Sequence, residues 1–199
     1  MANRNTAGFG FRQSGTLGNT PATQGLSQYW IDSAASVNLY NGMAMKSSGG
    51  YMITGESATT VTTIGVLYGI YYNAASTNKP TWAHWYDATI TPANSEDTQA
   101  FVNDYPFQKY TIASDTAVAA DVPAAHVKFM ETFSVNANTG GSTSTGRSTT
   151  SLEIGQTNNT THSWRLLRSA EETENSDLTA AYCSLEVVSN LSEFVGSGT

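Results

Sequence analysis

Short apolar runs broken by glycine fill most of the chain, and they constrain its fold more than any other feature. From Val37 onward the runs read VNLY, GMAMKSS, GGYMITG and TTVTTIGVLYGIYYN, and later ones read PFQKYTIASD, TSLEIG, HSWRLLRSA and YCSLEVVSN. Runs of this length that are rich in Val, Ile, Thr and Tyr and bounded by turn residues are typical of β-strands. Roughly ten such segments predict an all-β fold, either a small β-barrel or a sandwich.

Two groups of glycines indicate how these strands connect and bend. Gly49-Gly50 stands between MAMKS and YMITG, which are equal in length, and two glycines can adopt the positive φ angles of a two-residue hairpin turn. Gly65 and Gly69 interrupt the longest apolar run. A bulge or bend at either glycine would curve the sheet toward a small barrel.

The polar surface is made of Ser, Thr and Asn rather than of charged residues, which are only 13% of the chain. These residues compete with a helical backbone for hydrogen bonds, so long helices are not expected. Ser95 could cap one helical turn, and Asp121 with Pro123 looks like a helix start, although the alternation after Val127 favours a short turn followed by a strand. Residues 136–151 are a low-complexity stretch and predict a mobile loop.

Residues 1–30 differ from the rest and predict an extended N-terminal arm. They are rich in Gly, Asn, Gln and Thr and have too little apolar surface to fold alone. A disordered tail is one interpretation, but aromatic side chains are unusual in a segment that is only solvated. The other interpretation is an arm that becomes ordered on a partner. Its candidate contact residues are Arg4, Phe9, Phe11, Arg12, Tyr29 and Trp30.

The remainder of the chain divides into two predicted β subdomains. Residues 31–100 would form a barrel-like domain, and residues 101–199 a second subdomain or knob. A Thr-, Pro- and Asn-rich stretch around residues 87–100 is the expected junction.

Charge and hydropathy argue against nucleic-acid and membrane partners. The net charge is −7, and the two arginines of the arm leave the body still more acidic, whereas nucleic-acid binding needs a basic face. No apolar run approaches the roughly 20 residues of a transmembrane helix, and the first residues do not resemble a signal peptide. The protein is therefore expected to work where it is made.

Catalytic and cofactor motifs are not recognisable, so no catalytic residue, metal ligand or cofactor is predicted. No nucleophile elbow or phosphate-binding glycine loop occurs, and His84, His126 and His162 lack metal-ligand spacing. Cys183 lies in an alternating segment that predicts a buried, inert thiol. The acidic residues between Glu171 and Asp177 could surround a calcium ion, but a solvated turn fits better because their spacing matches no calcium loop.

An aromatic concentration in the middle of the chain is the one compositional feature that could hold a ligand. Its rings could form part of the core, lie at a subunit contact or offer a stacking platform for a glycan. The residues are Tyr68, Tyr71, Tyr72, Trp82, Trp85 and Tyr86.

Several segments in order give the chain a resemblance to a known class of proteins. The segments are the opening MANRNTAGFGFR, then NGMAMKSSGGYMITG with TTIGVLYGIYYN, then FVNDYPFQKYTIASD and WRLLRSAEETENSDL. Together they resemble virion structural proteins of tailed bacteriophages, especially marine ones, and among these the head decoration, or cement, proteins. The stretch that ends at Ile64-Gly65-Val66-Leu67 is similar to the strand pattern of lambda-type decoration proteins.

The resemblance implies a capsid-stabilising protein that is not an enzyme. Such a protein would be made in the host cytoplasm and sit on the outer capsid surface as a homotrimer that bridges subunits of the major capsid protein. The alternative is a glycan-binding head or tail appendage that uses the Trp82 and Trp85 region. A polysaccharide-degrading enzyme is a third class, supported only by carboxylates whose pairing a sequence does not reveal.

Overall fold

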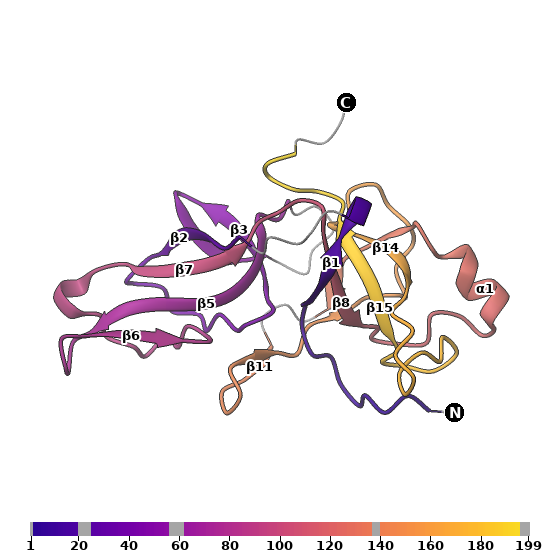
Figure 1. Cartoon of the computed structure of the whole chain (residues 1–199), viewed down its shortest axis with the longest axis horizontal. Coiled ribbons are helices and arrows are strands. Elements are labelled where there is room, and N and C mark those ends of the chain that lie inside the picture. The colour runs from indigo at the N-terminus through magenta and orange to yellow at the C-terminus, as the bar shows by residue number, and fades with distance from the viewer. Residues whose placement is uncertain (1, 20–24, 56–61, 137–139, 196–199) are drawn as a thin grey trace.

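A computed structural model of the chain describes residues 2–19, 25–55, 62–136 and 140–195. It is an elongated molecule with one antiparallel β-sheet at each end (Figure 1). Sheet A has the strand order β1 (Arg12–Thr16), β8 (Gln108–Ala113), β15 (Ser184–Ser189), β14 (Trp164–Ser169) and β9 (Thr132–Phe133). Both ends of the chain therefore contribute to sheet A.

Sheet B is formed by the middle of the chain. Its order is β2 (Ser27–Ile31), β7 (Thr98–Asn103), β5 (Gly65–Ala74), β3 (Ala44–Ser48) and β4 (Tyr51–Thr54), and β6 (Lys79–Ala83) pairs with the far part of β5. Two small ladders join β10 (Val135–Asn136) to β13 (Ser151–Leu152) and β11 (Gly141–Ser142) to β12 (Arg147–Ser148). The described helical segments are η1 (Leu17–Asn19), η2 (Ala93–Ser95) and α1 (Val122–Val127).

The all-β prediction is confirmed, and the expected barrel is wrong. Neither sheet closes on itself, since within the described chain sheet A keeps the edge strands β1 and β9 and sheet B keeps β2, β4 and β6. Sheet B bends far enough for β2 and β4 to contact one another, but no hydrogen-bonded ladder between these strands is found in the part of the chain that the structure describes. The sandwich alternative stays a prediction.

Two local predictions about glycine are confirmed. Gly49 and Gly50 have φ angles of 59° and 90° and form the turn between β3 and β4, where Ser48 pairs with Tyr51. The register of β5 against β7 shifts between Leu67 and Gly69, so a bulge lies where glycine interrupts the apolar run.

The short helical predictions were partly right. Asp121 caps α1, and its side chain accepts a hydrogen bond from the Ala124 N–H, so the expected turn is a six-residue helix that leads into β9. Ser95 is wrong as a cap: η2 begins after Pro92, no side chain caps it, and Ser95 is its last residue. The described part of residues 136–151 contains β11, β12 and the start of β13, whereas residues 137–139 lie outside the description.

Two hydrophobic cores hold the sheets, and the chain links them. Alternation along each strand sends one set of side chains inward: in β2, Tyr29 and Ile31 face the core of sheet B while Trp30 faces out. The core of sheet A includes Ala44 and Val66, which come from strands of sheet B. The two ends of the molecule therefore share buried residues.

The described part of residues 1–30 belongs to the body, which corrects the expectation of an arm that orders only on a neighbour. β1 pairs with β8 and β2 pairs with β7, so the main-chain hydrogen bonds of both segments are made within the chain. The segment has little apolar surface of its own, but it gains order from distant strands of the same molecule. Residues 1 and 20–24 of the predicted arm lie outside the described residues.

Candidate functional site

The predicted aromatic residues do not form a single cluster. Tyr86 is 1% exposed, and its hydroxyl donates a hydrogen bond to the Ala35 carbonyl, so it is a core residue. Trp85 stacks on Tyr40 with ring centroids 5.2 Å apart, and Tyr72 also packs against the core of sheet B. Tyr86 therefore lies in the core of sheet B, Trp85 and Tyr72 pack against it, and Tyr72 also lines the hollow described below.

The other predicted aromatics lie on the outer face of sheet B, where register brings four strands together. Trp30 of β2 is opposite Gln99 of β7, Gln99 is opposite Tyr71 of β5, and Tyr71 is opposite Trp82 of β6. All four side chains share one face because each is flanked by residues that face the core. We call this row, Trp30, Gln99, Tyr71 and Trp82, the aromatic ladder.

A second row of rings adjoins the ladder. The Trp82 ring centroid lies 4.9 Å from that of Phe101 and 6.3 Å from that of Tyr68. Gly69 permits this contact, because a Cβ atom there would come within 2.6 Å of the Trp82 ring. Tyr68, Trp82 and Trp30 remain exposed, so the rings pack on each other without being covered.

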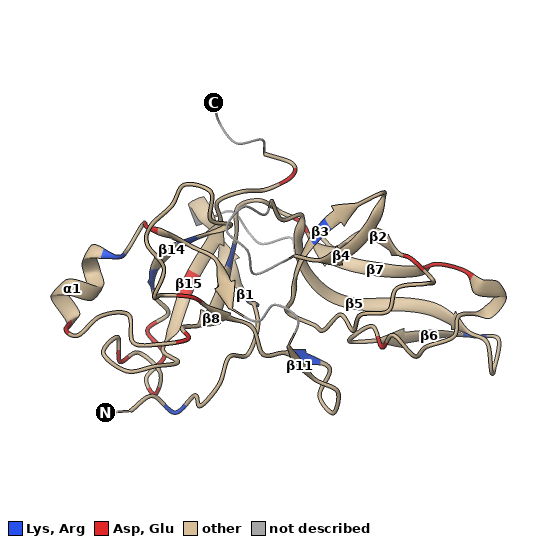
Figure 2. Cartoon of the chain, turned by 180° about the vertical axis from the view of Figure 1, so that it is seen from behind, with Lys and Arg blue, Asp and Glu red and all other residues tan. Residues whose placement is uncertain are grey.

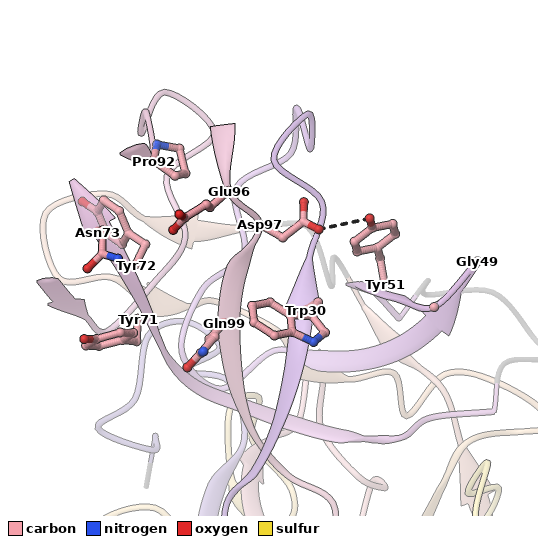
Figure 3. Close-up of a pocket in the computed structure, with 11 residues that line it drawn as sticks. Trp30, Gly49, Tyr51, Tyr71, Tyr72, Asn73, Pro92, Glu96, Asp97 and Gln99 are labelled. Carbon is pink, nitrogen blue, oxygen red and sulfur yellow. Dashed lines mark hydrogen bonds between the residues drawn. The ribbon is translucent and has the colours of Figure 1, made fainter. Parts of the chain in front are cut away.

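The outer face of sheet B contains a hollow of about 570 Å³ that includes most of the ladder. Figure 3 shows Trp30, Gln99 and Tyr71 side by side across its floor, with Glu96 and Asp97 at its rim. The β3–β4 hairpin contributes Tyr51 to the opposite wall. Strands β2, β7 and β5 thus form the floor of the hollow. The loop with Glu96 and Asp97 and the Gly49-Gly50 turn also line it.

The rim is acidic and partly fixed by hydrogen bonds. Asp97 accepts hydrogen bonds from the Tyr51 hydroxyl at 3.1 Å and from the Ser33 N–H at 2.9 Å. The hydrogen bond to Asp97 raises the pKa of Tyr51. Lys and Arg are missing from the described lining of the hollow, and Figure 2 shows acidic residues where the chain enters β7.

The predicted arm residues lie in different environments. Phe11 is 4% exposed and packs between Tyr110 and Trp164, so it is a core residue and not a partner contact. Arg4 pairs with Glu174 of the same chain at the surface. Arg12 lies over the Phe9 ring at 4.0 Å.

The two remaining arm residues belong to β2. The Tyr29 hydroxyl donates to Asp104 at 2.7 Å, and burial, together with this hydrogen bond, raises the pKa of Tyr29. Trp30 is 49% exposed and lies in the hollow, apart from the other arm residues. Arg4 lines a separate pocket beside Glu174, and Phe11 and Arg12 line a third, so Trp30 is the arm residue that lies in the hollow of sheet B.

The other candidates from the sequence are accounted for locally. Cys183 is buried as predicted, and burial raises the pKa of its thiol. Within the acidic segment, Glu172 accepts from Ser184 and Asp177 accepts from Thr179. Among the described residues no group of three or more His, Cys, Asp or Glu side chains could hold a metal ion, and no helix is long and apolar enough to cross a membrane.

Sequence reasoning missed the contribution of Gln99, Phe101 and Tyr51 to this face. The alternation in TQAFVN carries a signal for the first two, because Ala100 and Val102 are buried and their neighbours must face out. No local signal connects Tyr51 to Asp97, since 46 residues separate them.

Comparison with protein-family models, with curated proteins and with solved structures finds no match to this chain. The case for its function therefore depends on its own residues and geometry.

Proposed function

We propose that the chain is a non-catalytic structural protein of a phage virion, made in the host cytoplasm, that decorates the outside of an icosahedral capsid and bridges subunits of the major capsid protein. The observation that carries this proposal is the presence of separate exposed apolar patches at opposite ends of an elongated molecule. A protein that bridges neighbours needs contact surfaces that are far apart, whereas a single-ligand protein needs one.

One patch lies at the end of sheet A, around α1. Val127 is 75% exposed and Met130 is 58% exposed, and Val122, the first residue of α1, is also exposed. Met130 has a φ angle of 71°, a conformation that non-glycine residues rarely adopt, so the chain holds this side chain outward at some cost in backbone strain. The outer face of sheet B lies at the other end (Figure 1).

A third patch lies beside β1. Tyr105 and Phe107 are both exposed and contact each other edge to face, and the Leu17 N–H donates a hydrogen bond to the Phe107 carbonyl. In this proposal the patches replace the arm as the capsid-contacting and trimer-forming surfaces. The low charge of the surface supports the proposal, since ordering Lys and Glu side chains at a contact costs entropy.

Capsid binding tests the proposal directly. Full-length protein is mixed with capsids assembled from the major capsid protein encoded with it, and occupancy is measured by sedimentation and by imaging of the particles. The double variant Val127→Ser with Met130→Ser should bind at least about tenfold more weakly, because each exposed apolar side chain contributes to a buried contact.

The variant Val37→Ser is the matched control, since Val37 is exposed and lies outside the α1 patch. It should bind like the unchanged protein. If the unchanged protein does not bind the particles, the proposal is refuted. If the double variant binds them fully, the α1 patch is not a capsid contact. A trimer in solution, measured by light scattering, is the expected oligomeric state.

A further inference from the structure

The aromatic ladder has the shape of a platform rather than of a core or a cage. Its rings stand in a row across strands that are ~4.8 Å apart, so Trp30 and Tyr71, with β7 between them, are separated by ~10 Å. Two rings at this spacing on one gently curved face can each stack on a different unit of an elongated ligand.

Polar side chains between and around the rings are free to bind such a ligand. The side chains of Gln99, Glu96 and Asn73 all line the hollow, and in the described structure none of them makes a hydrogen bond or ion pair. Gln99 lies between Trp30 and Tyr71, where its amide can both donate and accept. Asp97, in contrast, accepts one hydrogen bond on each carboxylate oxygen from residues that hold the rim.

The charge of the hollow restricts the ligand class. Glu96 and Asp97 contribute negative charge, and the described lining holds no cation to offset it, so an anionic ligand would be repelled. A ligand with apolar faces for stacking and hydroxyl groups around its edge matches rings interspersed with amides and a carboxylate. These are the properties of a chain of neutral sugars.

We propose that the outer face of sheet B binds a neutral oligosaccharide or polysaccharide chain, with Trp30 and Tyr71 stacking on two sugar units and Gln99 hydrogen-bonding between them. The same face is one of the contact patches of the proposed function, but glycan binding is measured on the isolated protein and requires no capsid. This inference moves the site away from Trp85, whose ring is stacked on Tyr40, and it brings in Trp30, which the sequence assigned to the arm. Trp82 extends the platform at its far end.

An array of neutral and acidic glycans tests the proposal with purified full-length protein, followed by titration calorimetry on the best neutral ligand. We expect binding to neutral glycans and none to acidic ones. Trp30→Ala and Tyr71→Ala should each weaken binding about tenfold, since each removes one stacked ring. Glu96→Gln should reduce the discrimination against acidic glycans, because it removes one negative charge from the hollow.

Phe194→Ala is the matched control, because Phe194 is an aromatic residue exposed to about the same extent as Trp30 but lies outside the ladder and outside the three contact patches. Its affinity should be unchanged, and thermal melts should show that all variants are folded. The proposal is overturned by an array with no neutral hit, by affinities that Trp30→Ala and Tyr71→Ala leave intact, or by preferential binding of an acidic glycan. Binding of polylysine in place of any glycan would instead identify a cationic peptide as the ligand and overturn it as well.

Discussion

Phe9 and Phe11 stand two residues apart, and the structure gives them opposite environments. Phe11 packs on Trp164 with ring centroids 4.1 Å apart and is buried, whereas Phe9 is half-buried and contacts Arg12. Phe11→Ala should therefore lower the free energy of unfolding by about 3–5 kcal/mol, because it leaves a cavity in the core. Phe9→Ala should cost about 1 kcal/mol or less. Urea denaturation of both variants measures the difference, and equal losses would contradict the burial of Phe11.

Asp177 is a residue whose charge should persist to low pH. The Thr179 hydroxyl donates to its carboxylate at 2.6 Å and the Thr179 N–H donates at 3.0 Å, and the hydroxyl hydrogen bond is the largest contribution to lowering the pKa of Asp177 to about 2. Because the pKa is lower in the folded state than the ordinary value of 3.8, the stabilisation is complete above that value and is lost as pH falls toward 2.

Carboxyl NMR titration measures this pKa. Thr179→Val should raise the pKa of Asp177 toward its ordinary value, and Thr179→Ser, which keeps the hydroxyl, should leave it low. An unchanged pKa in the valine variant would show that the hydroxyl hydrogen bond is not its cause.

At the scale of elements, the turn of the β3–β4 hairpin needs glycine at position 50 because of its backbone conformation and not because of limited space. Its φ angle is 90°, and a Cβ atom there would meet nothing within 4 Å. Gly50→Ala should destabilise the protein by about 1–2 kcal/mol through strain. Gly155→Ala is the control, since Gly155 also has open space but no positive φ, and it should be neutral. Thermal melts compare the two, and equal midpoints would contradict the strain argument.

Strand β1 closes one edge of sheet A and carries Phe11 into its core. Deleting residues 1–16 would expose the edge of β8 and uncover Tyr110 and Trp164. The shortened chain should lose its near-UV circular dichroism and bind a hydrophobic dye, in contrast to the folded body expected if this segment were a separate arm. A shortened chain with a sharp cooperative melt would restore the arm interpretation.

The sequence predicts those elements whose signals are local. The turn at Gly49-Gly50, the bulge at Gly69 and the cap at Asp121 each depend on a residue's own conformational preferences or on neighbours in the chain. The aromatic ladder depends instead on strand register across three segments that are distant in the sequence. Likewise, β1 pairs with β8 although all strands of sheet B lie between them in the sequence. Several pairings would satisfy the same alternation, so neither the ladder nor the position of the first thirty residues follows from pattern alone.

At the scale of the whole molecule, the connection between the sheets predicts that they unfold together. The chain enters sheet A, leaves it for all of sheet B and returns, and Ala44 and Val66 of sheet B lie in the core of sheet A. Main-chain hydrogen bonds cross as well, from Phe11 to Gly42 and from Thr63 to Leu191. Calorimetry should therefore show one transition, and Leu185→Ala in sheet A and Ile70→Ala in sheet B should each lower the same midpoint, because both side chains are fully buried. Two transitions, each shifted by only one of these substitutions, would show that the sheets are independent domains.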